Sequence, residues 1–174
     1  LEGSVYAASK YDQERMCLRF GRAFGIPTTA LRFFNVFGTR QSLSNPYTGD
    51  LARFASRLLA GRRPLLAEDG EQLRDFIDVR EVATACRLAM SADTRHAVIN
   101  VGSGRATSLS EVARRMAGVA GSSNLAPEVT GKYQIGDVRH CFADVGRAKQ
   151  ALGHQAQGHL DAGLLELLDW VAQQ

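Results

Sequence analysis

Short apolar segments alternate with longer segments of helical spacing along this chain of 174 residues. Residues 28–34 (TTALRFF), 64–67, 76–79 and 97–101 (AVINV) are apolar and bounded by turn residues, which is typical of strands. Helices are expected at 5–23, 51–60, 80–90, 108–121, 144–153 and 161–171. This alternation predicts an α/β fold.

The strand expected at 28–34 adds a constraint, because a buried strand in an α/β sheet needs neighbouring strands on both sides. Only one helix precedes it here, and the chain begins without methionine. We therefore expect that the sequence is cut, and that chain upstream of Leu1 would supply the missing neighbours.

Composition disfavours several classes of protein. An apolar content of 45% is enough for the core of one domain, or of one and a half. We expect neither a membrane span nor a signal peptide, because no apolar run has the length or the flanking residues of either. The three cysteines and four histidines show no metal-ligand spacing, so we expect no metal and a reducing cytoplasm. The net charge of +3 is small, and no basic stripe supports nucleic-acid binding.

The first helix carries Tyr6 and Lys10, four positions apart and therefore one turn apart on the same face. A phenol is a weak base at neutral pH, because its pKa is about 10, but a neighbouring ammonium favours the phenolate. Such a pair could take the proton of a hydroxyl that is oxidised by hydride transfer to a nicotinamide. The alternative is a surface pair without function, because a motif is only a hypothesis until its context agrees.

The context is given by three motifs in order: YAASK at 6–10, LRFFNVFG at 31–38 and LRDFIDV at 73–79. Their order and spacing resemble those of the extended short-chain dehydrogenase/reductases, the NAD-dependent nucleotide-sugar epimerases and dehydratases. The resemblance covers essentially the whole chain. The segment RQSLSNPYTG at 40–49 is most similar to the branch acting on deoxythymidine-diphosphate 6-deoxysugars, such as rhamnose 4-epimerases.

The resemblance implies the C-terminal part of a Rossmann-type NAD(P)-binding fold with a smaller substrate-binding α/β region. Residues 1–34 would be a remnant of the Rossmann domain, and residues 35–174 the substrate-binding region, with some elements returning to the Rossmann sheet. NAD is the implied cofactor, with NADP not excluded, and a nucleotide-diphosphate sugar is the implied substrate. A homodimer, or other self-association through the first helix, is implied as well.

The resemblance also implies roles for single residues. Tyr6 would be the general base or acid at the sugar hydroxyl, and Lys10 would bind the nicotinamide ribose. The segment with Phe33 and Phe34 would pass beside the nicotinamide. Asn35 would contact the substrate diphosphate, at the carboxyl end of a strand, where ligands of α/β sheets bind. The alternative for Asn35 is an ordinary turn residue.

Two arginines, Arg74 and Arg139, match positions that clamp the nucleotide diphosphate, and a guanidinium can hold two phosphate oxygens at once. The alternative is that both are solvated surface residues. Arg40 and Gln41 are further candidates for the substrate pocket. Asp75 is expected to be a structural partner of the backbone or of Arg74.

Other residues depart from the family or imitate a motif. Asp78 and Glu81 stand where the family often has His and Asp, which affects pocket detail and not the fold. Residues 102–104 (GSG) follow a strand like a phosphate-binding loop, but Thr107 replaces the third glycine of that fingerprint, so we expect a turn. The apolar residues at 164–170 are expected to be a core-packing helix face.

The glycine-rich pyrophosphate loop of the family is not in this sequence, so we expect the 174 residues alone to bind NAD weakly or not at all and to show no turnover. The leading hypothesis is part of an enzyme that oxidises sugar C4 to a transient keto sugar. A non-catalytic nucleotide-diphosphate-sugar-binding module, or a degenerate family member, is the alternative. Epimerase, dehydratase and reductase stay open, as do the sugar and the base.

Overall fold

The computed structural model describes residues 4–43, 49–132 and 138–174. Within these ranges helices and short strands alternate, and the fold is α/β, as the sequence predicts. In order, the elements are α1 (Val5–Phe24), β1 (Thr29–Phe33), β2 (Asn35–Phe37), α2 (Asp50–Leu59), β3 (Leu65–Leu66), β4 (Leu73–Arg74), β5 (Phe76–Asp78), α3 (Val79–Ser91), β6 (Ala97–Val101), β7 (Thr107–Ser108), α4 (Leu109–Val119), β8 (Glu128–Val129), β9 (His140–Cys141), α5 (Gly146–Leu152) and α6 (Leu160–Val171).

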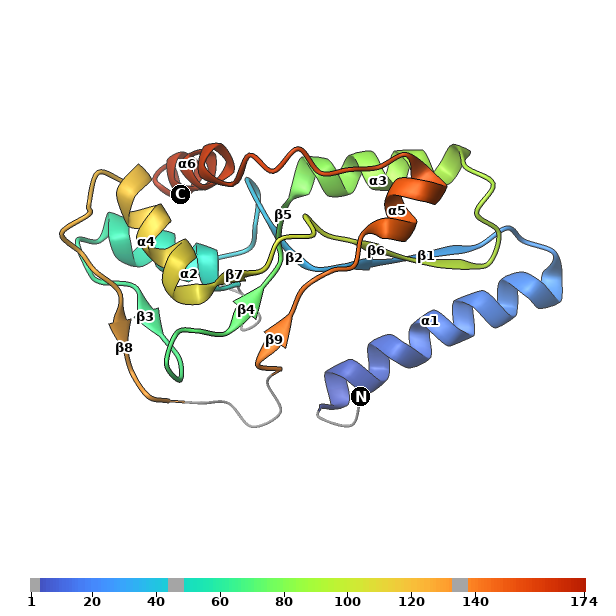
Figure 1. Cartoon of the computed structure of the whole chain (residues 1–174), viewed down its shortest axis with the longest axis horizontal. Coiled ribbons are helices and arrows are strands. Elements are labelled where there is room, and N and C mark those ends of the chain that lie inside the picture. Colours follow the sequence, from blue (N-terminus) through green and yellow to red (C-terminus); the bar gives the residue numbers. More distant parts are fainter. Residues whose placement is uncertain (1–3, 44–48, 133–137) are drawn as a thin grey trace.

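Two pairs of parallel strands form the centre of the molecule. β1 pairs with β6 along its whole length, with Thr29 opposite Ala97, and β2 pairs with β5, with Asn35 opposite Phe76. Between them the Phe34 N–H donates to the last carbonyl of β6 (3.1 Å), so β1 passes directly into β2. α3 and α5 cover one face of the β1–β6 pair, and α1 lies against the other (Figure 1).

Of the smaller strands, β3, β7 and β8 lie near α2 and α4, on the left of Figure 1, and β4 and β9 lie nearer the centre. There β4 is flanked by β7, which is antiparallel to it, and by β9, which is parallel to it. β3 and β8 form a further parallel pair. Both β4 and β9 lie below the β1–β6 pair in Figure 1, on the same side as α1.

The largest apolar core joins α2, α4 and α6 around Phe37, Leu66 and Phe76. Smaller clusters lie between α3 and the strands, around Ile77, and between α5 and β6, around Ile99. Because the largest core supports the end of β2 and the start of β5, it fixes the loops that follow the central strands, where ligands of α/β folds bind.

Local signals set several helix ends. The Ser4 hydroxyl caps α1 by accepting from the Ala7 N–H (3.1 Å), and Gly25 ends the helix with a φ of 67°. The Ser108 hydroxyl caps α4 by accepting from the Glu111 N–H (3.1 Å).

Some sequence expectations are corrected by the structure. Residues 35–37 form β2, a strand that is not among those expected, because they pair with β5, about forty residues further on. β1 is less buried than expected, with Phe33 49% exposed, since the described residues give it a strand neighbour on one side only. α5 begins at Gly146, two residues after the expected start at 144, and the Asp144 carboxylate accepts from the Gly146 N–H (2.9 Å). Leu165 faces outward, 45% exposed, while Leu164 and Leu167 are fully buried.

α1 makes few contacts with the rest of the chain. Its one buried residue is Gly21, where a Cβ would lie 2.1 Å from the Thr28 hydroxyl oxygen. Further along, the Arg32 guanidinium of β1 makes two hydrogen bonds to the Glu14 carboxylate (2.7 and 2.8 Å). That arginine holds the pKa of Glu14 below its ordinary value. No helix of the described residues is both long and apolar enough to cross a membrane.

Candidate functional site

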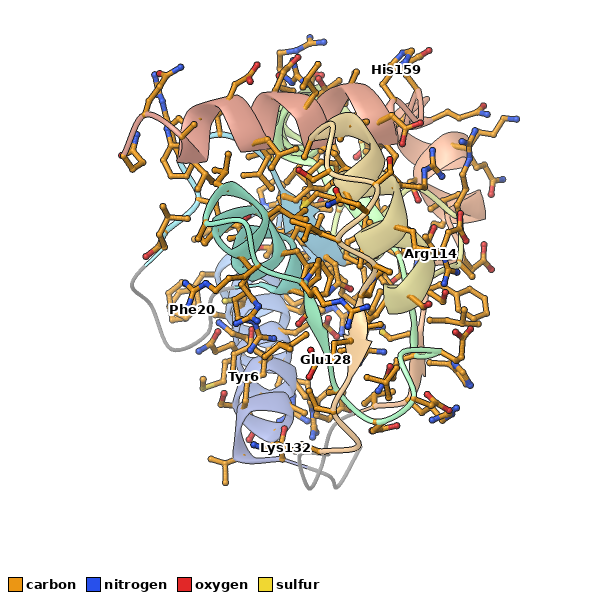
Figure 2. The ribbon with its side chains drawn as sticks, turned by 90° about the vertical axis from the view of Figure 1, so that its left-hand side faces the viewer. Tyr6, Phe20, Arg114, Glu128, Lys132 and His159 are labelled. Atoms are coloured by element: carbon orange, nitrogen blue, oxygen red, sulfur yellow. The ribbon has the colours of Figure 1, made fainter. Side chains whose placement is uncertain are left out.

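Tyr6 and Lys10 lie on one face of α1, as their spacing predicts. The Lys10 Nζ atom is 5.6 Å from the centroid of the Tyr6 ring, and it also donates to the Gln13 side-chain oxygen (3.4 Å). The tyrosine is 63% exposed, and Figure 2 shows it near the amino end of α1. An ammonium at this distance acts on the ring electrostatically, so the pair is assembled before any ligand arrives.

A second tyrosine on α1 makes a similar pair. Arg15 lies four positions after Tyr11, and its guanidinium carbon is 5.4 Å from the centroid of the Tyr11 ring. Tyrosine and cation at this spacing therefore do not by themselves mark a catalytic pair. The second pair is a matched internal control for the first.

The candidate cofactor residues follow at the carboxyl end of β1. Phe33 ends the strand and is half-exposed, and Phe34 joins β1 to β2. Asn35 begins β2, and its backbone N–H donates to the Asp75 carbonyl (2.9 Å). Its side-chain amide makes no hydrogen bond to any residue that the structure describes, so it is available to a ligand.

The loop after β2 carries the other two candidates. Arg40 is exposed and has a φ of 67°, a left-handed conformation that is uncommon outside glycine. The side-chain oxygen of Gln41 is buried and accepts no hydrogen bond within the described ranges. A buried acceptor without a donor is costly, so a ligand hydroxyl or N–H at this point would stabilise the loop. The rest of the motif at 40–49 includes residues 44–48, which lie outside the described ranges.

The structure brings Arg74 and Arg139 together. Arg74 is 8% exposed, and its Nη1 atom donates to the carbonyl oxygens of Leu73 (3.0 Å) and Arg139 (2.9 Å). The guanidinium of Arg74 therefore supports the backbone at Arg139. The expectation of two separate phosphate forks stays a prediction, and the geometry makes the two positions neighbours.

The Arg139 guanidinium is held by two carboxylates. It donates to Glu68 (2.9 Å) and to Asp69 (2.6 Å) in the turn before β4. Arg139 holds the pKa of Asp69 below its ordinary value, and Asp69 raises the pKa of Arg139 in return. Sequence reasoning missed these two acids, because about seventy residues separate them from the arginine and no local pattern links them.

Asp75 is fully buried and organises the loops behind the candidate residues. One carboxylate oxygen accepts from the backbone N–H and the hydroxyl of Ser103, both at 2.7 Å. The other accepts from the backbone N–H groups of Gly104 (2.9 Å) and Ala143 (3.1 Å). Asp75 is thus a partner of the backbone, as expected, and no bond from it to Arg74 is recorded among the described residues.

The glycine-bearing loop at 102–104 therefore binds an anion of its own chain. A Cβ on Gly102 would lie 2.6 Å from the Asp75 carboxylate and 2.7 Å from the Ala143 side chain. Glycine is required there because the carboxylate passes so close to the backbone. The loop is a turn, as predicted, and its N–H groups are occupied. In the described ranges no cluster of three or more His, Cys, Asp or Glu residues could hold a metal ion.

Comparisons with known proteins give the context of this site. A family model described as "NAD dependent epimerase/dehydratase family" matches residues 2–102. The chain is 38% identical over 173 residues to dTDP-L-rhamnose 4-epimerase of Burkholderia thailandensis, covering 98% of this chain and 47% of that protein.

Two solved structures are similar along nearly the whole chain. UDP-N-acetylglucosamine 4-epimerase from Methanobrevibacter ruminantium, in complex with UDP-N-acetylmuramic acid, aligns with a TM-score of 0.91 and 32% identity, covering 100% of this chain and 56% of that one. MoeE5, in complex with UDP-glucuronic acid and NAD, aligns with a TM-score of 0.83 and 35% identity, covering 97% and 55%. The chain spans about half the length of the relatives that it matches.

Proposed function

The chain belongs to the NAD-dependent epimerase/dehydratase family, and from this premise we propose that it supplies the catalytic pair and the substrate-binding part of a nucleotide-sugar 4-epimerase. The observation that carries the proposal is the exposed Tyr6–Lys10 pair of α1, with the ammonium 5.6 Å from the ring. The relative that is a dTDP-L-rhamnose 4-epimerase supports a deoxythymidine-diphosphate sugar as substrate. The two relatives bound to UDP sugars support a nucleotide diphosphate more generally.

In this proposal Tyr6 moves the proton. Its phenolic oxygen accepts the proton of the sugar 4-hydroxyl as C4 becomes a ketone, and returns it when the alcohol forms again. Lys10, one turn further along, can donate to the ribose of the cofactor through its ammonium. Both side chains are exposed, so they can reach a bound sugar.

The residues present suit only one part of NAD, its nicotinamide end. When bound, NAD would supply the hydride acceptor for the oxidation of sugar C4 and, in an epimerase, the hydride that restores the alcohol. Tyr6, Lys10 and the half-exposed Phe33 offer an open surface for its nicotinamide end. No glycine-rich pyrophosphate loop lies within the described ranges, because the one candidate, at 102–104, holds Asp75. We therefore propose that the 174 residues alone bind NAD weakly or not at all.

The proposed substrate side consists of Asn35, Gln41, Arg74 and Arg139. The free amide of Asn35 and the buried, unpartnered oxygen of Gln41 suit sugar or phosphate groups. Arg139 would have to exchange Glu68 and Asp69 for phosphate oxygens, which is feasible because both carboxylates lie at the surface and such pairs are weak. Residues 1–34 would then act with a Rossmann domain, and residues 35–174 would form the substrate-binding region.

The test is a chimera in which this chain replaces the matching part of the Burkholderia thailandensis relative. We expect the chimera to interconvert the 4-epimers of the sugar nucleotide, and Tyr6→Phe to lower kcat about 100-fold or more, because proton transfer by a placed side chain contributes at least that factor. Tyr11→Phe is the matched control, since that tyrosine has the same spacing to a cation on the same helix. Equal activity of the two variants would contradict the proposed role of Tyr6.

A non-catalytic module that binds nucleotide-diphosphate sugars is the second candidate, favoured by the free groups at Asn35 and Gln41. It predicts that thymidine diphosphate raises the melting temperature of the 174-residue chain while NAD does not. An inactive chimera together with that stabilisation would select this candidate. A reducing compartment, the cytoplasm, suits the free cysteines Cys17 and Cys141, which are both exposed.

Self-association through α1 is proposed as well. Met16, Phe20 and Phe24 are 63%, 57% and 66% exposed, and the rings of the two phenylalanines lie 4.4 Å apart. An apolar surface of this kind favours association. Light scattering of the purified chain should show a dimer or larger species that Phe20→Asp dissociates, and a strictly monomeric wild type would contradict the proposal.

A further inference from the structure

A small cavity lies on the face of the molecule opposite α1, between α3, α6 and the loop that leads into β7. Its volume is about 280 Å³, and its floor is apolar, with Phe37, Phe76, Ile77 and Leu160 in the wall. None of the candidate catalytic, cofactor or substrate residues lines it. Figure 2 shows His159, which lies at its rim, far from Tyr6.

One hydroxyl in this wall opens to the cavity. Thr107 is 8% exposed, and its hydroxyl makes no hydrogen bond to any residue of the described ranges. Its oxygen is not among the fully buried side-chain atoms that lack a partner, so it is accessible from the cavity. A hydroxyl that opens to the cavity can donate to an acceptor that enters it.

A cation without a counter-charge stands at the same wall. Within the described part of the chain, the side chain of Arg105 makes no hydrogen bond and no ion pair. Arg105 is exposed at the mouth of the cavity, and its guanidinium lies over Gly158, where a Cβ would come within 2.8 Å of the Nη1 atom. The glycine, with a φ of 75°, thus leaves room for the guanidinium at the cavity.

The carboxylates around the cavity already have partners. Asp78 and Glu166 hold the two sides of the Arg80 guanidinium, at 2.8 and 3.0 Å. Glu81 accepts from the Gln157 N–H (2.9 Å) and faces the buried His154 ring (3.6 Å). The Arg105 guanidinium and the Thr107 hydroxyl are left over as donors, beside the His159 ring at the rim, so this wall is complementary to an anion.

We propose that this cavity binds a small monocarboxylate with a compact apolar body, through Arg105 and Thr107. A carboxylate suits the planar guanidinium, and the second of its oxygens can accept from the hydroxyl. The volume equals that of about nine waters and lies at the lower end of ligand pockets, which limits the body to a single ring or a short branched chain. A phosphate dianion fits less well, because the apolar floor gives its oxygens no donors and because the nearby Glu81 and Glu166 repel two charges more strongly than one.

The experiment uses benzoate as the probe and the whole 174-residue chain. Binding is followed by the NMR signals of the Thr107 and Ile77 methyl groups and by the melting temperature. We expect saturable shifts of both methyl signals and a rise in melting temperature. Benzamide, which has the same shape without the charge, should give neither, and inorganic phosphate should not compete.

Two variants and a matched control separate the contributions. Arg105→Gln and Thr107→Val should each weaken benzoate binding, the first by about tenfold or more, as expected when a charge-assisted hydrogen bond is lost. Arg87→Gln removes an exposed arginine of α3 that does not line the cavity, and should leave the affinity unchanged. The proposal is overturned if benzoate gives no saturable shift, if Arg105→Gln binds it as tightly as the wild type, or if benzamide or phosphate binds equally well.

Discussion

Asp75 accepts four hydrogen bonds behind the candidate site, and its replacement by asparagine removes half of them. The substitution keeps the shape but changes one oxygen into an NH2 group, which cannot accept and which faces two donors. Whichever oxygen is lost, two of the four hydrogen bonds to Ser103, Gly104 and Ala143 disappear. The donors on that side are left without a partner inside a fully buried site.

The expected cost follows from these contacts. Two hydrogen bonds to a charged acceptor contribute about 3–6 kcal/mol, and the asparagine regains part of this because no charge has to be buried. We therefore expect Asp75→Asn to lower the free energy of unfolding by about 3 kcal/mol, a large part of the total of about 5–15 kcal/mol that is usual for a domain. With a urea m-value of about 2 kcal/mol/M, the midpoint of unfolding should fall by about 1.5 M.

Urea unfolding followed by circular dichroism measures this shift, and two controls scale it. Ser103→Ala removes one hydroxyl bond to the same carboxylate and should cost about 1 kcal/mol. Asp93→Asn alters an exposed acid in a surface pair with Arg95 and should leave the midpoint unchanged. If Asp75→Asn moved the midpoint no more than Asp93→Asn, the buried carboxylate would not be holding the loops, and the reasoning would be refuted.

Two further predictions rest on single contacts. Gly102→Ala should destabilise the chain by about 1–3 kcal/mol, because the new methyl group collides with Asp75. Gly118→Ala is the control: its methyl group meets nothing within 4 Å, so it should be neutral or stabilising by about 0.5–1 kcal/mol. Equal urea midpoints for the two variants would contradict this. The pKa of Glu14 is lowered from 4.5 by Arg32, so its pair stabilises the fold fully above pH 4.5 and the stabilisation is lost as the pH falls through the lower, folded-state pKa. Glu14→Gln should therefore reduce stability at pH 7 and flatten its fall with acid, and unchanged pH profiles of the urea midpoint would exclude this contribution.

The sequence predicts the fold class and most helices because their signals are local. The cap at Ser108 and the glycine that ends α1 can be read from neighbouring residues alone. β2 could not be predicted in this way, because residues 35–37 become a strand only through pairing with β5.

In the candidate site, too, local features can be predicted from the sequence and contacts between distant segments cannot. The position of Tyr6 and Lys10 on one helix face follows from their spacing, and the structure agrees. The surroundings of Arg139 do not follow from sequence spacing, because Glu68 and Asp69 reach it only through the pairing of β4 with β9. Spacing along a helix is fixed by geometry, whereas partners across strands depend on how the whole chain packs.

The bond from Arg74 to the Arg139 carbonyl changes how substitutions at the two positions have to be interpreted. A variant without the Arg74 guanidinium also releases the backbone that presents Arg139, so its loss of affinity would include part of the contribution of its neighbour. The effects of the two single substitutions should therefore sum to more than the effect of the double one, and a thermodynamic cycle would give the coupling energy between them. The contributions of the two arginines to the free energy of ligand binding therefore have to be measured together.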